Sequence, residues 1–110
     1  MGIYIDGQSI ETDKDGHLKN LQDWNETVAE HLAAQENIML AQAHWEIIYL
    51  LREFYQEFEL APAMRPLVKR VAQKLGGDKG RSVYLMQLFP PSPARVAAKI
   101  AGLPRPPNCF

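Results

Sequence analysis

The sequence predicts a mainly α fold of the α+β type: a small helical domain of about five helices, with an N-terminal β-hairpin and an extended C-terminal arm. Three observations predict this fold. An Asp-Gly dipeptide separates two short runs near the start, several later segments repeat apolar residues at helical spacing, and prolines cluster towards the end. We expect a single domain over 1–110, divided into a hairpin and loop at 1–22, a helical body at 23–102 and the arm at 103–110.

The first elements are a hairpin and a loop. Residues 3–5 and 8–10 flank Asp6-Gly7, which supplies the positive φ angles of a tight two-residue turn. The polar stretch 12–20 continues as turn and loop. Because a two-stranded ribbon is only marginally stable alone, we expect it to pack on the helical body.

Two helices should follow the loop. Either Asp23 or Asn25 can cap a helix through 27–34, which Asn37 would end. The strongest helical pattern runs over 41–59, where apolar residues recur on one broad face, and we expect this segment to be the central core helix. The side chains expected at its surface are His44, Glu46, Glu53 and Glu57.

A third helix covers 64–75. Proline is tolerated in the first turn of a helix, so Pro66 fixes the start near Ala63. Gly76-Gly77 should end the helix with a left-handed cap.

Two short helices complete the body. The first covers about 79–88 and stops at a Phe-Pro-Pro sequence. The second runs from Pro93 to Ala101 behind a Ser92 cap, and Gly102 closes it. The residues expected to be buried in the 79–88 helix are Val83, Tyr84, and Met86 or Leu88.

The composition excludes several classes of site. At 110 residues the chain can bury one hydrophobic core. A single cysteine excludes an internal disulfide and a multi-thiolate metal site, and the three histidines form no H-x-x-x-H pair, so we expect no metal and no cofactor. The apolar runs are too short to cross a bilayer, and the opening residues lack the pattern of a signal peptide. We therefore expect a cytoplasmic protein without membrane contact.

Charge is divided unevenly along the chain. Residues 1–60 hold twelve Asp/Glu against three Lys/Arg, whereas residues 61–110 hold nine Lys/Arg against one acid, Asp78. One interpretation is that the basic half binds a polyanion or an acidic partner surface. The other is that the two halves attract each other within the fold. The sequence leaves both interpretations open.

The arm carries the residue best suited to chemistry. Three prolines between 104 and 107 favour a stiff polyproline-II segment, and Cys109 lies beyond it. An exposed lone thiol is normally a liability, so its place at the tip of an arm suggests that it reaches another protein's site. Its thiolate would attack a donor persulfide. Positive charge from Arg105 and the basic half would favour the thiolate and the terminal carboxylate one residue away would oppose it, and the sequence leaves that balance open. We therefore predict Cys109 as the catalytic residue of a sulfur carrier.

Two other functional classes compete with this interpretation. The helices at 64–75 and 79–88, joined by a glycine turn, are typical of a helix-turn-helix, and a nucleic-acid-binding regulator or a non-catalytic adaptor is the alternative function. A stand-alone enzyme is not expected, since the usual nucleophile, phosphate-binding and zinc motifs do not occur. The basic residues available for phosphate contacts are Arg65, Lys69, Arg70, Lys74, Lys79 and Arg81.

Short segments spread over almost the whole chain resemble the DsrC/TusE family. They are His44-Trp45-Glu46, Arg52-Glu53-Phe54-Tyr55, Pro62-Ala63-Met64-Arg65, Leu67-Val68-Lys69, Tyr84-Leu85, Leu88-Phe89-Pro90 and Lys99-Ile100-Ala101-Gly102-Leu103-Pro104, followed by Cys109. Many separate matches in the same order make this a specific resemblance. It implies a small helical domain with an N-terminal hairpin and a C-terminal arm that bears the reactive cysteine.

The cysteine count indicates the branch. The branch tied to dissimilatory sulfite reductase has a second cysteine where this sequence has Ala98. The single-cysteine pattern is similar to TusE, which implies that Cys109 accepts sulfur from a TusBCD-like complex and passes it towards an MnmA-like tRNA thiouridylase. We expect a monomer when free. The candidate residues for partner binding are Arg65, Lys69, Arg70 and Arg105.

Overall fold

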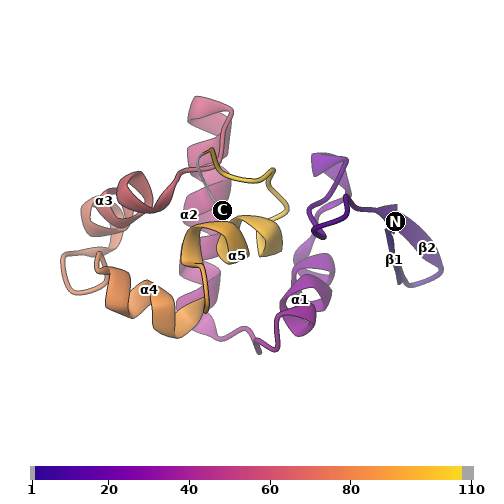
Figure 1. The fold of residues 1–110 in the computed structure, drawn as a ribbon, viewed down its shortest axis with the longest axis horizontal. Helices are drawn as coiled ribbons and strands as arrows, with labels where there is room; N and C mark the ends of the chain where they lie inside the picture. Colours follow the sequence, from indigo (N-terminus) through magenta and orange to yellow (C-terminus); the bar gives the residue numbers. More distant parts are fainter. Residues whose placement is uncertain (1, 108–110) are drawn as a thin grey trace.

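A two-stranded hairpin and five α-helices form the part of the chain that the computed structural model describes, residues 2–107 (Figure 1). The hairpin projects from one end of the helical body, and α3 and α4 lie at the opposite end. This arrangement confirms the predicted fold class. The elements are β1 (Gly2–Ile5), β2 (Gln8–Glu11), the 3-10 helix η1 (Leu21–Asp23), α1 (Glu26–Gln35), α2 (Gln42–Phe58), α3 (Met64–Leu75), α4 (Ser82–Leu88) and α5 (Pro93–Ile100).

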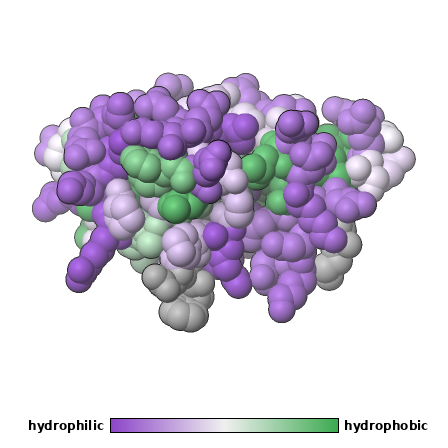
Figure 2. Space-filling model, turned by 90° about the horizontal axis from the view of Figure 1, so that it is seen from above, coloured by the Kyte–Doolittle hydropathy of each residue, from purple (hydrophilic) through white to green (hydrophobic). Residues whose placement is uncertain are grey.

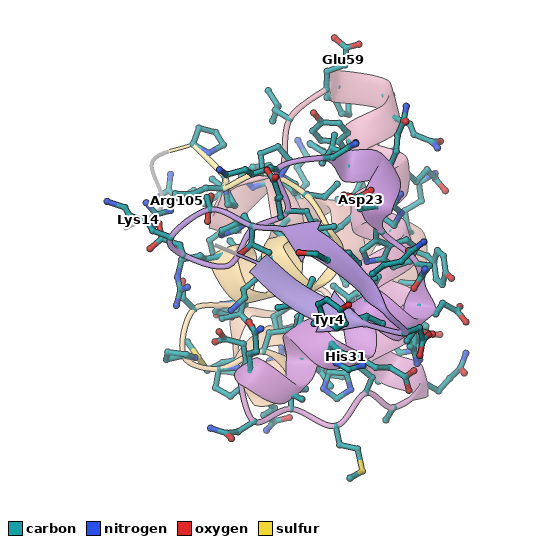
Figure 3. The ribbon with its side chains drawn as sticks, turned by 90° about the vertical axis from the view of Figure 1, so that its right-hand side faces the viewer. Tyr4, Lys14, Asp23, His31, Glu59 and Arg105 are labelled. Atoms are coloured by element: carbon teal, nitrogen blue, oxygen red, sulfur yellow. The ribbon has the colours of Figure 1, made fainter. Side chains whose placement is uncertain are left out.

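The hairpin forms where the Asp-Gly turn predicts it. β1 and β2 pair antiparallel, with Ile3 opposite Ile10, and both Asp6 and Gly7 have positive φ angles of 51° and 81°. This is the left-handed backbone that a tight two-residue turn requires. Alternation along β1 turns Ile5 inwards, whereas Tyr4 is 73% exposed and points away from the body (Figure 3).

The boundaries of α1 decide between the two predicted caps. Asn25 is the N-cap, and its side-chain oxygen accepts a hydrogen bond from the backbone N–H of Val28 at 2.9 Å. Asp23 instead belongs to η1. The helix ends at Gln35, and Asn37 follows with a φ of 60°, so it marks the end as expected.

The start of α2 corrects one prediction. His44 was expected at the surface, but it is buried between α2 and the end of α4. Its Nδ1 accepts from the backbone N–H of Ala41 at 3.0 Å, its Nε2 lies 2.9 Å from the carbonyl oxygen of Leu88, and its ring edge meets Phe89. The imidazole therefore caps the start of one helix and the end of another, a pairing between distant segments that helical periodicity does not reveal.

Helices α3 and α4 differ from their predicted details. Gly76 ends α3 with φ 103° and ψ 159°, which is not the left-handed helical cap expected. α4 starts at Ser82 rather than near 79, since the backbone N–H groups of Lys79 and Gly80 both donate to the carbonyl of Gly76 in a turn that precedes the helix. Gly80 in this turn packs so closely on α3 that a Cβ there would lie 2.4 Å from Ala72. In the resulting register Leu85 is buried and Val83 is 69% exposed, so the predicted burial of Val83 is wrong.

The short helix α5 contacts all four other α-helices, and it lies across α2 in Figure 1. Its small residues Ala94, Ala97 and Ala98 are almost completely buried, which allows its neighbours to approach closely. Lys99 is also buried, and its ammonium group lies 2.8 Å from the carboxylate of Glu36. The longest helix was expected to be the central one, but the central position belongs to the helix that leads into the arm.

Exposed hydrophobic side chains are divided among several elements. Tyr4 in β1, Met39 before α2 and Val83 in α4 are the most exposed large hydrophobic residues of the described chain. Hydrophilic residues cover most of the face drawn in Figure 2, and hydrophobic residues show between them in small areas. No helix within residues 2–107 is long and apolar enough to cross a membrane.

Candidate functional site

The predicted catalytic residue, Cys109, lies outside the described residues. The structure does describe the first five residues of the arm, 103–107, and the junction through which the arm leaves α5. Leu103 is only 2% exposed and Pro106 is buried as well. The arm therefore does not project freely from residue 103 as the proline pattern suggested, because its first residues pack on the body.

The end of α5 is a complete Schellman motif. The backbone N–H of Leu103 donates to the carbonyl of Ala98 at 2.9 Å, and that of Gly102 donates to the carbonyl of Lys99 at 3.1 Å. Gly102 has the required positive φ of 77°. It also packs on Trp24, where a Cβ would lie 2.4 Å from the Cδ1 atom of the ring. Only glycine fits this position, for two independent reasons.

Three side chains bind backbone carbonyl groups that receive no hydrogen bond within this motif. The indole N–H of Trp24 donates to Ile100 at 2.9 Å, the guanidinium of Arg52 to Ala101 at 2.6 Å, and Nδ1 of His17 lies 3.0 Å from the oxygen of Leu103. The donors come from the segment between η1 and α1, from α2, and from the 12–20 loop. Every backbone carbonyl at the end of a helix needs a partner, and distant parts of the chain supply these partners. We call Trp24, Arg52 and His17 the junction donors.

The junction donors also contact one another and their surroundings. The guanidinium carbon of Arg52 lies 3.9 Å from the centre of the Trp24 ring, a cation–π contact. Burial lowers the pKa of Arg52, while the nearby Tyr49 opposes that change. The hydroxyl of Tyr49 donates to Glu26, and this hydrogen bond, helped by burial, raises the pKa of Tyr49. Tyr49 thus stays protonated as a donor, and its ring meets that of Trp24 edge-on.

His17 is held by the loop that contains it. The carboxylate of Asp13 accepts from the backbone N–H of Asp15 at 2.8 Å and from that of His17 at 3.0 Å. Burial acts to raise the pKa of Asp13, but these hydrogen bonds and the nearby imidazole outweigh it and lower the pKa. His17 itself is 1% exposed, and its Nε2 atom has no hydrogen-bond partner among the described residues. Its Nδ1 therefore carries the proton that Leu103 accepts.

Arg105 is the predicted binding residue that lies closest to this site. Its guanidinium is 3.3 Å from the carboxylate of Asp15, and both side chains are partly exposed. Figure 3 shows Arg105 on the same edge of the molecule as Lys14, next to the 12–20 loop. The arm is thus held a second time, beyond the junction, by a surface ion pair.

The other predicted binding residues lie on α3 and are not equivalent. Arg65 and Lys69 are exposed. Arg70 faces α2, where it pairs with Glu57 at 2.8 Å and lies near the Phe54 and Phe58 rings. The arginine is therefore used within the fold, and the structure does not present Arg70 as an open contact for a partner.

The ion pairs also bear on the two interpretations of the charge asymmetry. Each ion pair between described residues joins an acid from the first half to a base from the second. Among the six basic residues considered for phosphate contacts, Arg70, Lys74 and Lys79 are paired with glutamates of α2. The two halves do attract each other, and this reduces the charge available on the α3–α4 pair.

Sequence patterns do not reveal the junction donors. Trp24 and His17 carried no motif, and Arg52 entered only as part of a family segment. Their acceptors are backbone carbonyls 49 to 86 residues away, which leave no pattern in the sequence. The glycine at 102 was the one available signal, and it was interpreted as a helix end only. Within residues 2–107 there is no group of three or more potential metal ligands.

Comparisons with known proteins match almost the whole chain. The family model described as DsrC like protein matches residues 4–110. A sulfurtransferase TusE homolog from Haemophilus influenzae is 55% identical, over 98% of this chain and 99% of the relative. The sulfurtransferase TusE of Photorhabdus laumondii is also 55% identical, over 98% and 97% of the two chains.

Solved structures give the same result. The NMR structure of DsrC from Allochromatium vinosum superposes with a TM-score of 0.90 at 48% identity, and the match covers 99% of this chain and 97% of that one. The crystal structure of the oxidized gamma-subunit of dissimilatory sulfite reductase from Archaeoglobus fulgidus superposes with a TM-score of 0.87 at 36% identity, over the full length of both chains.

Proposed function

This chain belongs to the DsrC-like protein family, and on that premise we propose that it is a cytoplasmic sulfur carrier that holds persulfide sulfur on Cys109 and relays it towards tRNA 2-thiolation. The observation that carries the proposal is the full-length match to proteins named sulfurtransferase TusE in a chain with one cysteine. A sulfur carrier needs one nucleophilic sulfur, and Cys109 supplies it.

The transfer step needs no cofactor and no external oxidant. The thiolate of Cys109 attacks the outer sulfur of a donor persulfide, the donor S–S bond breaks, and the donor cysteine leaves as a thiolate. The product is a persulfide on Cys109, and the outer sulfur keeps its oxidation state. A second exchange with an acceptor thiolate moves the same sulfur on and regenerates the Cys109 thiolate.

The single-cysteine pattern supports a carrier rather than a disulfide cycle. By the family resemblance, the DsrC branch has a second cysteine at the position of Ala98. In this chain Ala98 is a fully buried residue of α5. With one cysteine, the chain cannot form an internal disulfide. By the resemblance to TusE, the donor is a TusBCD-like complex and the acceptor is an MnmA-like thiouridylase with its tRNA.

The alternative of a nucleic-acid-binding adaptor has weaker support. α3 and α4 are joined by a turn as in a helix-turn-helix, but half of the basic residues considered for phosphate contacts are engaged by α2. The exposed Arg65, Lys69 and Arg81 remain for a partner surface.

The decisive test is a mass measurement without reducing agent. The protein is incubated with a TusBCD-type complex loaded with persulfide sulfur, and the intact and peptide masses are recorded. We expect one added sulfur atom on the C-terminal peptide, which is lost on reduction and does not occur in Cys109→Ser. A competent donor that transfers nothing to the wild-type protein would overturn the carrier function in favour of the adaptor.

A further inference from the structure

We propose that the junction donors Trp24, Arg52 and His17 are positioning residues for sulfur transfer, because they fix the direction in which the arm leaves the helical body. The inference rests on the proposed function. The last peptide group that these donors hold is that of Leu103, and six residues of extended chain span at most about 20 Å. The donors therefore set the point and the direction from which a thiol six residues further along is presented.

The arrangement of the donors indicates that they orient the start of the arm and do not only attach it to the body. The three hydrogen bonds reach the carbonyls of Ile100, Ala101 and Leu103, at 2.9, 2.6 and 3.0 Å. The donors belong to three separate segments of the chain, so the turn after α5 is bound to three parts of the body. A single contact would tether the chain, whereas three donors on neighbouring peptide groups also restrict its rotation.

The acceptors are backbone atoms, so the residues that position the arm do not use the side chains with which the arm could recognise a partner. The junction donors constrain the chain whatever side chains the arm carries, provided that residue 102 is glycine. Trp24 fills the space where a Cβ of residue 102 would lie, and the guanidinium carbon of Arg52 lies 3.9 Å from the centre of the same ring. Contacts of a partner with the exposed Pro104 and Pro107 thus leave the hydrogen bonds of the junction unchanged.

Beyond the junction the arm is held much less firmly. The pair between Arg105 and Asp15 has a 3.3 Å separation, and the two side chains are 47% and 34% exposed. Exposed ion pairs of this kind contribute little to stability and weaken with salt. A partner protein can displace this pair at small cost while the junction stays in place. The junction is then the fixed point from which the distal arm is presented.

The test compares a protein donor with a small donor. Trp24→Phe keeps an aromatic ring but removes the indole N–H that donates a hydrogen bond to the carbonyl of Ile100. Trp45→Phe on α2 is the matched control. Sulfur uptake by each folded variant is timed with a persulfide-loaded TusBCD-type complex and with glutathione persulfide. Small misplacements of a reacting group cost up to about 100-fold in rate. We expect Trp24→Phe to slow uptake from the complex about 10-fold or more and to leave uptake from glutathione persulfide unchanged.

A second variant guards against an effect of folding alone. Arg52→Met removes the donor to Ala101 but keeps an apolar stem, whereas Arg52→Lys retains a cationic donor and should recover part of the rate. Equal rates for Trp24→Phe and wild type with the complex would overturn the inference. Equal slowing with both donors would also overturn it, because the thiol itself would then be altered. A wild-type protein that takes sulfur from glutathione persulfide but none from the complex would instead refute the proposed relay, and the inference with it.

Discussion

The junction between α5 and the arm joins segments that are 49 to 86 residues apart in the sequence, whereas the surface between α2 and α3 joins two consecutive helices, and the two use different kinds of contact. On the α2–α3 surface, Arg70 and Lys74 pair with Glu57 and Glu53 at 2.8 and 3.4 Å, and both carboxylates are more than half exposed. At the junction, side-chain donors meet backbone carbonyls around the almost fully buried Leu103.

The difference teaches which contacts specify a geometry. Exposed ion pairs tolerate several arrangements of two long side chains, and each contributes little to stability. A buried carbonyl that loses its donor is left unsatisfied, which costs about 1–3 kcal/mol. The α2–α3 surface therefore brings two oppositely charged helices together, whereas the junction requires one particular course of the chain.

The largest effect that we predict concerns Gly102. Gly102→Ala places a Cβ against the Trp24 ring, 2.4 Å from Cδ1, at a backbone φ of 77°. The left-handed backbone costs about 1–2 kcal/mol and the overpacking about 1–3 kcal/mol. We expect the free energy of unfolding, measured by urea denaturation, to fall by about 3 kcal/mol.

Gly7→Ala provides the matched control for this prediction. Gly7 has a similar φ of 81°, but a Cβ there would meet nothing within 4 Å. We expect it to show the backbone cost alone, about 1–2 kcal/mol. Equal losses of unfolding free energy for the two variants would show that the contact with Trp24 adds no strain. The claim that the junction, unlike the α2–α3 surface, requires one particular course of the chain would then fail.

A smaller effect is predicted for the α2–α3 surface. The double variant Glu53→Gln and Glu57→Gln removes the partners of Arg70 and Lys74 but keeps the side-chain volumes. We expect a loss of about 1 kcal/mol in urea denaturation at low ionic strength, and a smaller loss at 1 M salt, where the Debye length is about 3 Å. A loss above about 2 kcal/mol that salt does not reduce would place this surface in the same class as the junction.

The same contrast explains what the sequence could predict. The hairpin, the five helices and most of their ends follow from local signals, such as the Asp-Gly turn, the Asn25 cap and Pro93 at the start of α5. The ion pairs were foreseeable as one interpretation of the charge asymmetry. The burial of His44 and the three junction donors were not, because their partners are backbone carbonyls of remote residues. Cys109 was found from its isolation and from the family resemblance, and it stays a prediction.

The smallest predicted effect tests the loop that supports the junction. The pKa of Asp13 is lowered from 3.8, because backbone hydrogen bonds outweigh the opposing effect of burial. A carboxylate with a depressed pKa in the folded state adds stability above its unfolded pKa and loses it as the pH falls through the folded value. Asp13→Asn keeps an oxygen acceptor but has no charge to lose. We therefore expect wild type to exceed the variant in unfolding free energy above about pH 5, with the difference shrinking below about pH 4.

Urea denaturation of both proteins at a series of pH values measures that difference, and titrations common to both cancel in it. A difference that stayed constant down to pH 2 would mean that the charge of Asp13 adds nothing to the loop, and that the backbone alone holds His17 against the junction.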